Sequence, residues 1–588
     1  MASNVFELNS IVQLRSLTIP TNFQTVSLLG YNTPGDGGGG EFYYDSSSMA
    51  GGVTGDNGGT IIKPNSIIPA NPGRWIRIYS GKVNARWFGA IGDGITNDAT
   101  SIQNALNTTE NLFIPDGVYK ISSPLVIKTN GQCITGESLN VILKPSTSAV
   151  RATIAVYTGV TNYVIDTLTL LGCATNDGGA PRHNGIWCNT DLTTNGTEYD
   201  AYGLINNVRL SGQTPGVNGY NACIVVILSN YVTVQNCYID SFVGTISDTT
   251  YGSFGLGLQI SGKYAVADSN FIMNPIPASG RHCIYSTYCP YARVSQNTVG
   301  GCTSSAIIFN TEVGTNSYMQ VVNNQVFEGA KNGTVFEAGA ILLNYQADAT
   351  SSGSNNLVSG NIILNAGRSG IRTFGLSSSI ISDNIISGFA KSTSASGVNQ
   401  GAIEISEGSG NQILNNAIST TQSDSTLRVI NLLGHSNAMV SNNKISINTA
   451  RNALQIGSTC TNINASTNQF SGSFTTTVEN QAYALSANTT CLVENLLLYA
   501  EKVYDPASIA AGLTAQTDVT VTGARTGDVV EGCSLIALPA NTVNANILLI
   551  GQVVSSNLVT VTLWNISGSA IDLGNSKLRV QVRTALAR

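Results

Sequence analysis

Short runs in which apolar and polar residues alternate extend from about residue 112 to residue 480, and Gly, Asn or Ser interrupts them. The runs are rich in Val and Ile, and each is too short to bury its apolar face alone, which is typical of strands that stack on neighbours. One stretch has helical spacing instead. Ile102 and Leu106 share one face of residues 99–106, and Asn97 or Asp98 is the predicted N-cap. The pattern therefore predicts mainly β structure with one short helix.

A seven-residue pattern that ends in Asn recurs along these runs; Tyr264 to Asn270, for example, reads YAVADSN. Successive copies are separated by 23 to 37 residues. A fixed local pattern at a variable interval indicates a solenoid with loops of different lengths. Asn suits the corner because it tolerates the left-handed conformation, and stacked Asn side chains can hydrogen-bond along the axis. The terminal positions are Cys237, Asn270, Asn297, Asn324, Asn361, Asn384, Asn416, Asn443 and Asn468.

A second pattern, small–aliphatic–x–apolar, occurs about once per coil. The aliphatic residue should point inward and the next residue outward, because side chains alternate along a strand. We therefore expect two exposed columns, two residues apart, on one face. The first contains Trp187, Tyr285, Ile308, Leu342, Arg372, Glu404 and Gln455; the second contains Asn189, Thr287, Asn310, Asn344, Phe374 and Ser406.

Composition changes the picture in two ways. Charged residues make up 11% of the chain, against about 25% in typical proteins, which disfavours a helical fold. The net charge is −6, with no run of five or six basic residues and no apolar stretch of 18 residues. We therefore expect neither nucleic acid nor membrane insertion. The 11 cysteines form no C-x-x-C pair and are predicted to be reduced core residues without a metal role.

The fold class that these patterns predict is all-β: a right-handed parallel β-helix with a small N-terminal neck domain and a C-terminal antiparallel β-sandwich. A Gly-rich segment precedes the helical stretch, and period-two runs such as Leu558 VTVTLWN follow the solenoid. The predicted domains are residues 1–83 (neck), 84–111 (capping segment), 112–485 (β-helix) and 500–588 (sandwich).

The segment Phe88 GAIGDGITNDATSIQ resembles the motif GA-x-GDG-x-x-DD-x-x-A-I-Q of the pectate-lyase-like β-helix superfamily, with Asn97 and Ser101 as departures. The Gly-rich neck before it is similar to that of bacteriophage tailspikes. This resemblance implies a homotrimer that needs no cofactor and that binds and usually cleaves a capsular or O-antigen polysaccharide. It further implies a protein of the virion tail, in contact with other tail proteins, which folds in the bacterial cytoplasm and acts at the host surface. The C-terminal domain would serve trimerisation or carbohydrate binding.

The first column suits a polysaccharide, because sugars stack on aromatic rings and charged groups bind hydroxyls and carboxylates. The second column is polar without strong charge, as a neutral or weakly charged glycan would favour. Hydrolysis needs two carboxyl groups, for which we expect Glu312, Glu337 and Glu404. The expected substrate-binding residues are Trp187, Arg281, His282, Tyr285, Arg368, Arg372 and Glu407.

Two alternatives remain open at this stage. A polysaccharide lyase would use a base near His282 and cations such as Arg281 to neutralise a uronic acid. A fibre that only binds the glycan would cleave nothing. The sugar sequence, the linkage and the placement of the groove within or between subunits are not specified by these patterns.

Overall fold

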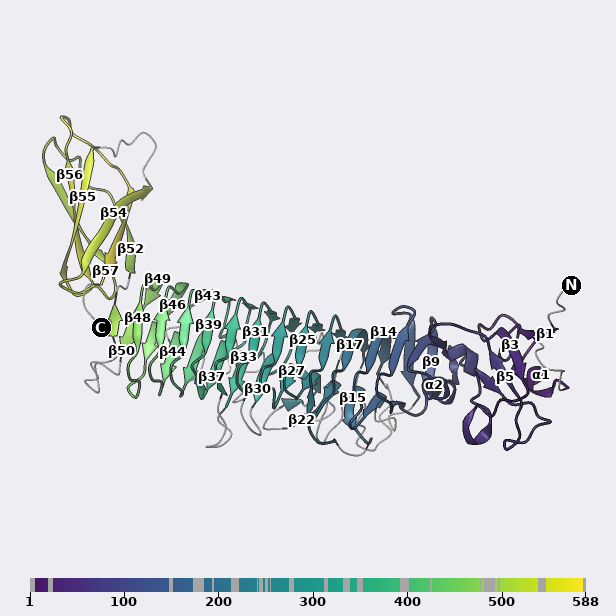
Figure 1. Ribbon diagram of the computed structural model, residues 1–588. Helices are drawn as coiled ribbons and strands as arrows, with labels where there is room; N and C mark the ends of the chain where they lie inside the picture. The colour runs from purple at the N-terminus through teal and green to yellow at the C-terminus, as the bar shows by residue number, and fades with distance from the viewer. Residues whose placement is uncertain are drawn as a thin grey trace. The chain divides into compact units, whose positions relative to one another are not determined.

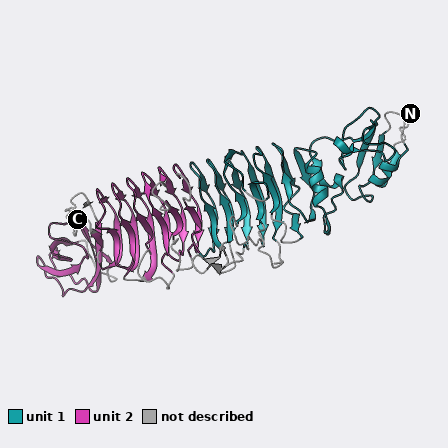
Figure 2. Ribbon diagram, turned by 90° about the horizontal axis from the view of Figure 1, so that it is seen from below, with its two compact units in different colours: residues 1–303 teal, residues 304–588 magenta. Residues whose placement is uncertain are grey.

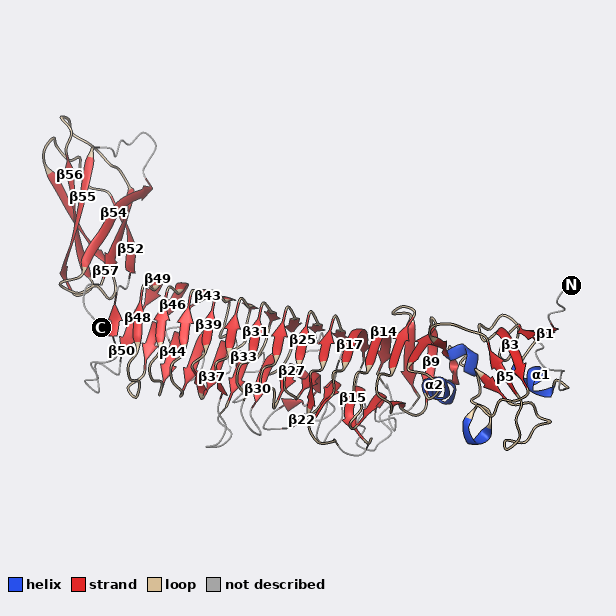
Figure 3. Cartoon of the chain, in the orientation of Figure 1, coloured by secondary structure: helices blue, strands red, loops and turns tan. Residues whose placement is uncertain are grey.

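The computed structural model describes residues 6–18, 25–146, 152–172, 184–192, 195–212, 222–240, 242, 247–248, 252–253, 255–273, 280–310, 316–330, 339–345, 353–391, 401–423, 426–475, 477–480, 492–494, 497–537 and 546–584. Two compact units, residues 1–303 and 304–588, divide the chain (Figure 2). Most of the described chain is β-strand (Figure 3). No helix in the described ranges has both the length and the apolar character needed to cross a bilayer.

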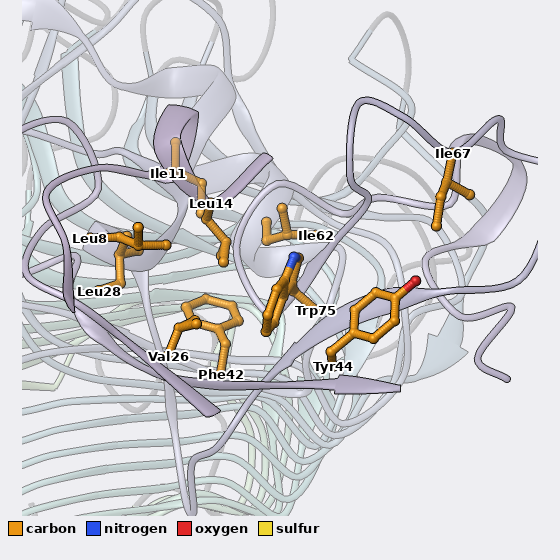
Figure 4. Packing of buried hydrophobic residues seen from close by; sticks show 10 residues of the cluster. All are labelled: Leu8, Ile11, Leu14, Val26, Leu28, Phe42, Tyr44, Ile62, Ile67 and Trp75. Carbon is orange, nitrogen blue, oxygen red and sulfur yellow. The ribbon is translucent and has the colours of Figure 1, made fainter. Parts of the chain in front are cut away.

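A small sheet with its own core opens unit 1. Its strand order is β1-β2-β3-β5-β4, and Leu14, Phe42 and Trp75 are fully buried against it (Figure 4). The Gly-rich segment forms a tight turn in which the Asp36 carboxylate accepts four backbone N–H groups. An Asp side chain that accepts nearby backbone N–H groups in this way is typical of a turn. The elements are β1 (Phe6–Leu8), α1 (Ile11–Ser16), β2 (Thr25–Leu28), β3 (Gly40–Asp45), β4 (Ile61–Ile62) and β5 (Arg74–Arg77).

The predicted helix is confirmed as α2 (Ala99–Leu106), with Ile102 and Leu106 fully buried. Asp98 is the N-cap residue, but its carboxylate accepts the N–H groups of Ile91 and Gly92 instead of a helix N–H. Around this helix, parallel pairing begins with β6 (Val83–Asn84), β7 (Asp93–Asn97), β8 (Asn111–Ile114) and β9 (Gly117–Ile121).

Parallel strands then stack coil on coil in each unit (Figure 1), so the predicted parallel β-helix is confirmed. We call the sheet that holds the predicted columns sheet A. In unit 1 it contains β10 (Leu125–Ile127), β13 (Ala152–Tyr157), β15 (Asn184–Thr190), β18 (Ala222–Val226), β24 (Gly255–Ile260) and β27 (Gly280–Ser286). In unit 2 it contains β30 (Ile307–Asn310), β33 (Gly339–Asn344), β37 (Ser369–Phe374), β41 (Ile403–Ser406), β44 (Arg428–Leu433), β47 (Asn452–Ile456) and β50 (Val478–Asn480).

Most coils also contribute two strands, one on each side of the recurring corner, whereas β14 and β17 run through this corner as single strands. In unit 1 these strands are β11 (Cys133–Gly136), β12 (Val141–Pro145), β14 (Val164–Leu171), β17 (Leu204–Ser211), β20 (Thr233–Gln235), β21 (Tyr238–Asp240), β25 (Val266–Asp268), β26 (Phe271–Met273), β28 (Arg293–Ser295) and β29 (Thr298–Gly300). In unit 2 they are β31 (Gln320–Val322), β32 (Gln325–Phe327), β35 (Leu357–Ser359), β36 (Ile362–Leu364), β39 (Ile380–Ser382), β40 (Ile385–Ser387), β42 (Gln412–Leu414), β43 (Ala417–Ser423), β45 (Met439–Ser441), β46 (Lys444–Ala450), β48 (Asn464–Ser466), β49 (Gln469–Phe474) and β51 (Leu492–Glu494).

The Asn side chains form the predicted ladder within each unit. In unit 2, six consecutive Asn side chains from Asn324 to Asn468 are linked by Nδ2–Oδ1 hydrogen bonds of 2.9–3.0 Å. The expected left-handed conformation at these Asn residues was wrong. Positive φ angles occur one residue earlier, as at Asn323 and Asp383, and at the first residue of the heptapeptide, as at Tyr264. The ladder Asn is buried instead, because its amide also satisfies backbone groups of the neighbouring coils.

Two antiparallel groups of three strands end unit 2, and the first is joined to the solenoid by the pairing of β52 with β49. β52 (Leu497–Tyr504), β57 (Ser576–Arg583) and β54 (Val529–Ala537) form one, and β53 (Thr514–Thr520), β56 (Leu558–Asn565) and β55 (Ile547–Ser555) form the other. The inner residues Val559, Val561, Val580 and Val582 are fully buried, as alternation in a sandwich requires.

Candidate functional site

The first predicted column is a true register column of sheet A. In unit 2, Ile308 pairs with Leu342, Leu342 with Arg372, Arg372 with Glu404, Glu404 with Asn431 and Asn431 with Gln455. The column continues to Glu479. In unit 1, Trp187 pairs with Val225, Val225 with Gln259 and Gln259 with Tyr285. Counting one outward residue per coil therefore placed the predicted residues in one column, although it passed over Asn431, Val225 and Gln259.

The predicted exposure of this column was wrong. Trp187, Arg372, Glu404 and Gln455 are each only 3–4% exposed, and Tyr285 is half-buried. One reason is that neighbours in a parallel ladder lie about 4.8 Å apart and cover each other's flanks. A second reason is that the chain folds back over the column: Asn195 accepts a hydrogen bond from the Trp187 indole N–H, 2.9 Å, and bridges Thr190. Outward orientation on a strand thus did not imply contact with solvent.

Glu404 is the most heavily constrained carboxyl group of the column. The Ser369 hydroxyl donates to its Oε2 at 2.8 Å, and the Gly401 N–H donates to its Oε1 at 3.2 Å. Burial raises the pKa of Glu404, while Arg372, the two hydrogen bonds and Arg368 offset part of that increase. A carboxyl group held in this way stays protonated at a higher pH than an ordinary glutamate, which suits a proton donor.

Two arginines accompany Glu404. Arg372 Nε lies 3.7 Å from Glu404 Oε2, and its guanidinium lies 4.4 Å from the ring centre of Phe374. Arg368, one residue before β37, is half-buried and acts on Glu404 through its charge. Burial lowers the pKa of both arginines and the Glu404 charge opposes that effect. The structure thus brings together the predicted residues Arg368, Arg372 and Glu404.

The C-terminal part of the column contains polar residues that the sequence analysis missed or left without a role. Asn431 and Gln455 are 4% exposed, and no described residue donates a hydrogen bond to Asn431 Oδ1 or Gln455 Oε1. Glu479 pairs with Arg451 at 3.4 Å. Asn431 escaped notice because Val429 stands where the pattern requires a small residue. Gln259 in unit 1 fits the pattern Gly257–Leu258–Gln259–Ile260 and was detectable.

The residues proposed for a lyase lie in unit 1. Arg281, His282 and Tyr285 all belong to β27, and the His282 and Tyr285 rings are 5.5 Å apart. The Arg281–His282 pair lies within this strand, and His282 is fully buried. Trp187 packs in an apolar cluster with Ala152, Val225 and their neighbours, and Tyr285 packs against it. The aromatic end of the column is therefore largely occupied by its own packing.

The second column is only partly regular. Asn310, Asn344, Phe374 and Ser406 pair in order, and Asn344 Nδ2 donates to Asn310 Oδ1 at 2.9 Å. Asn189 was wrongly placed in this column. It lies at a β-bulge with φ +62°, is fully buried, and donates to the carbonyls of Thr197 and Ile227. A bulge shifts the register by one residue, which alternation alone does not predict.

Two predicted catalytic residues, Glu312 and Glu337, lie outside the described residues. Glu407 is exposed, with φ +60°, and its carbonyl oxygen lies 2.8 Å from His435 Nδ1. Within the described ranges no three His, Cys, Asp or Glu side chains are grouped as metal ligands. The nine described cysteines are free, and seven of them are buried, in agreement with the predicted core role.

Two grooves in unit 2 lie apart from sheet A. One, of about 560 Å³, is lined by residues of β49, β52 and β53 together with Arg579, and the other, of about 280 Å³, by hydroxyl and amide side chains with Lys391. Neither is lined by a residue of the first column.

Comparison with known proteins agrees with the N-terminal part of this description. Residues 7–80 match the family described as phage tail protein small four-stranded beta-sheet domain. The chain is also 33% identical over 122 residues to the Mu-like prophage FluMu defective tail fiber protein of Haemophilus influenzae, which covers 20% of this chain and 18% of that protein. The predicted resemblance to bacteriophage tail proteins is confirmed for residues 7–80, and the tail fiber protein is matched over less than a fifth of its length.

Solved structures with a similar fold include two tailspikes. The Pseudomonas phage phi297 tailspike has 12% identity and a TM-score of 0.47, with 86% of this chain and 100% of that chain covered. A tailspike double mutant of Escherichia coli bacteriophage HK620 in complex with pentasaccharide has 11% identity and a TM-score of 0.47, with coverages of 90% and 98%. The mannuronan C-5 epimerase AlgE6 A-module of Azotobacter vinelandii has 14% identity and a TM-score of 0.41, with coverages of 68% and 96%.

Proposed function

We propose that this protein is a tailspike that binds a capsular or O-antigen polysaccharide of a bacterium and cleaves it by endo-acting hydrolysis. The observation that carries the proposal is the buried Glu404 carboxyl group, whose pKa is raised and which two donors and Arg372 hold on the outer side of the β-helix strands. The phage-tail match over residues 7–80 supports a place in the virion tail. Perturbed carboxyl groups of this kind are concentrated at functional sites.

Glycosidic hydrolysis uses one protonated and one ionised carboxyl group. Glu404 is the proton donor in this proposal, because its raised pKa keeps the proton on the carboxyl group until the leaving oxygen takes it. The Ser369 hydroxyl and the Gly401 N–H fix the orientation of that group, and Arg372 stabilises the carboxylate left behind. Glu337 or Glu312 is the proposed partner that activates water or attacks the sugar.

A lyase is the second candidate. It is favoured by the contact between His282 and Tyr285 on β27, beside Arg281, since elimination needs a base and a cation that neutralises the uronic carboxylate. The third candidate is a receptor-binding fibre without catalysis. In all three cases the proposed assembly is a homotrimer that attaches to other tail proteins and needs no cofactor.

Incubation of the purified full chain with capsular polysaccharides separates these candidates. New reducing ends without an ultraviolet-absorbing unsaturated uronate indicate hydrolysis, formation of that uronate indicates elimination, and an unchanged polymer that binds indicates a fibre. We expect hydrolysis. Polymer that is neither bound nor cleaved across a broad panel of capsules would overturn the proposed function.

The substitution Glu404→Gln should lower kcat by about 10²–10⁴-fold, because a positioned general acid contributes an effect of that size. Glu337→Gln tests the proposed partner in the same assay. Asp383→Asn is the matched control: it removes an exposed carboxylate in unit 2 at a position with φ +56°, which Asn tolerates. Full activity of both Glu404→Gln and Glu337→Gln, with correctly folded protein, would show that the site is elsewhere.

A further inference from the structure

Positive charge collects where the strands of sheet A begin in unit 2. Arg368 precedes β37, Arg428 opens β44 and Arg451 precedes β47. Ile371 pairs with Ile403, Ile403 with Ile430, and Ile430 with Leu454, so these three arginines fall within one residue of the same level on their coils. Two coils separate β37 from β44, which corresponds to about 10 Å between the backbones that carry Arg368 and Arg428.

These arginines differ in how their charge is neutralised. Arg451 pairs with Glu479, and Arg372 with Glu404. Arg368 and Arg428 form no ion pair with the described residues, and the Nε atom of each is buried without a hydrogen-bond partner. A guanidinium has five N–H donors and no acceptor, so a buried unsatisfied donor carries a desolvation cost that a ligand oxygen would remove.

The local charge balance also favours an anionic ligand at these arginines. Arg368 and Arg372 act on the Glu404 carboxyl group, and Arg428 lies on the next coil, whereas the whole chain has a net charge of −6. Burial lowers the pKa of Arg368, and the Glu404 charge opposes only part of that effect. Among the described residues, the excess of cations is therefore a local feature of this edge and not a property of the whole chain.

We infer that Arg368 and Arg428 bind anionic groups on the polysaccharide, so that the substrate is an acidic glycan lying along the coils beside Glu404. This inference rests on the proposed function and revises the expectation of a neutral or weakly charged glycan that the second column suggested. A planar guanidinium binds carboxylate and phosphate oxygens in a bidentate manner. The shared chemistry is thus an oxyanion, supplied by a uronic acid or by a phosphodiester in the repeat unit.

The experiment compares acidic and neutral capsular polysaccharides with the full chain. We expect binding and cleavage of an acidic polymer that weaken as salt is added, because the ions screen the contact. Reduction of the polymer's carboxyl groups with carbodiimide and borohydride should raise the KM at least tenfold if the anion is a uronic acid. A polymer that keeps its KM after this treatment but loses affinity in the Arg368→Gln variant carries phosphate instead.

Variants of Arg368 and Arg428 test whether these residues contact the anionic group of the polysaccharide. Arg368→Gln and Arg428→Gln should each raise the KM by about tenfold or more and change kcat less, whereas Glu404→Gln acts on kcat. Arg368→Lys, which keeps the charge but loses the fork of donors, should give an intermediate KM. Lys444→Gln is the matched control, since it removes an exposed cation from β46 of the same unit and should leave the KM within twofold.

The failures are distinguishable. If the protein cleaves only neutral polymers, or if Arg368→Gln and Arg428→Gln leave the KM for an acidic polymer unchanged, this inference is wrong and the proposed function stands. If the protein binds and cleaves no polysaccharide, the proposed function fails and this inference fails with it. Should a Gln variant not fold, as judged by its thermal unfolding, the Arg368→Lys variant and the carboxyl-reduced polymer still decide the question.

Discussion

Glu404 acquires its properties from residues on two successive coils. Ser369 and Arg372 come from β37, whereas Gly401 lies just before the strand that holds Glu404 itself. Without these neighbours, desolvation alone would determine the pKa shift of this carboxyl group, which is 3% exposed. The proton affinity of Glu404 thus results from opposing effects, in which burial is the largest and raises the pKa.

The raised pKa of Glu404 predicts how stability depends on pH. In the unfolded chain the group titrates near its ordinary value of 4.5, so above that pH the unfolded state loses its proton first and is favoured. The free energy of unfolding of the wild type, relative to Glu404→Gln, should therefore fall as pH rises from about 4.5 to the raised value and then level off. A tenfold difference in proton affinity between the folded and unfolded chains corresponds to about 1.4 kcal/mol.

Thermal or denaturant unfolding of both proteins across this pH range measures the difference. The comparison cancels the other titrating groups, because they are common to both chains. A difference that is constant with pH, or that grows in favour of the wild type, would contradict the raised pKa.

At the scale of elements, the Asn ladder explains why coils with loops of different lengths keep one register. Asn384 accepts from the N–H and Nδ2 of Asn361, and it donates to the Val358 carbonyl and to Asn416 Oδ1, all at 2.9–3.0 Å. One side chain thus joins three consecutive coils at a buried corner. Because buried polar groups must be paired, a slip in register would leave several of them unsatisfied.

Asn384→Leu should destabilise unit 2 by about 3–6 kcal/mol, because the isosteric side chain leaves several donors and acceptors buried and unpaired. Asn464→Leu, at an exposed position of β48, should change stability by less than about 0.5 kcal/mol. Denaturant unfolding followed by circular dichroism checks both. Equal stability of the two variants would mean that the ladder is not what holds the register.

A second stack of side chains lies on the surface of unit 1. Tyr202, Tyr231, Tyr264 and Tyr291 stack face to face with ring centres 4.7–4.8 Å apart. Each has a positive φ angle, between 47° and 63°, which costs a non-glycine residue about 1–2 kcal/mol. Stacking of each ring on its neighbours offsets this cost, and the faces of the inner rings are not free to contact a ligand.

The same elements show how much of the structure could be predicted from the sequence. Alternation and the recurring Asn placed the coils and the partners Arg372 and Glu404, and helical spacing placed α2, since each depends on a local sequence pattern. Exposure depended on how segments return over a strand, as Asn195 does over Trp187, and no periodic signal encodes that return. The prediction for Asn189 was wrong because a bulge inserts one residue and so reverses the alternation that the prediction assumed.

At the scale of the whole molecule, the two ends of the chain bear on how the protein assembles. The N-terminal sheet has a core around Trp75 and matches a phage-tail domain. The sheet β53-β56-β55 exposes Leu548, Ile550, Val554 and Trp564 on one face, each between 41% and 51%. An apolar patch of this kind on a folded domain usually marks an interaction surface.

If the proposed homotrimer uses this face, a charge placed on it should break the assembly without unfolding the chain. Ile550 lies in β55 beside Thr562 of β56 and is 51% exposed. The substitution Ile550→Lys should convert trimers to monomers at micromolar concentration, because a buried unpaired charge is costly at an interface. Ser556→Lys adds the same charge to the exposed turn between β55 and β56 and should leave the trimer intact. Sedimentation velocity measures both masses, and circular dichroism verifies the fold; a trimeric Ile550→Lys protein would place the subunit interface on another surface and leave this apolar face for a different partner.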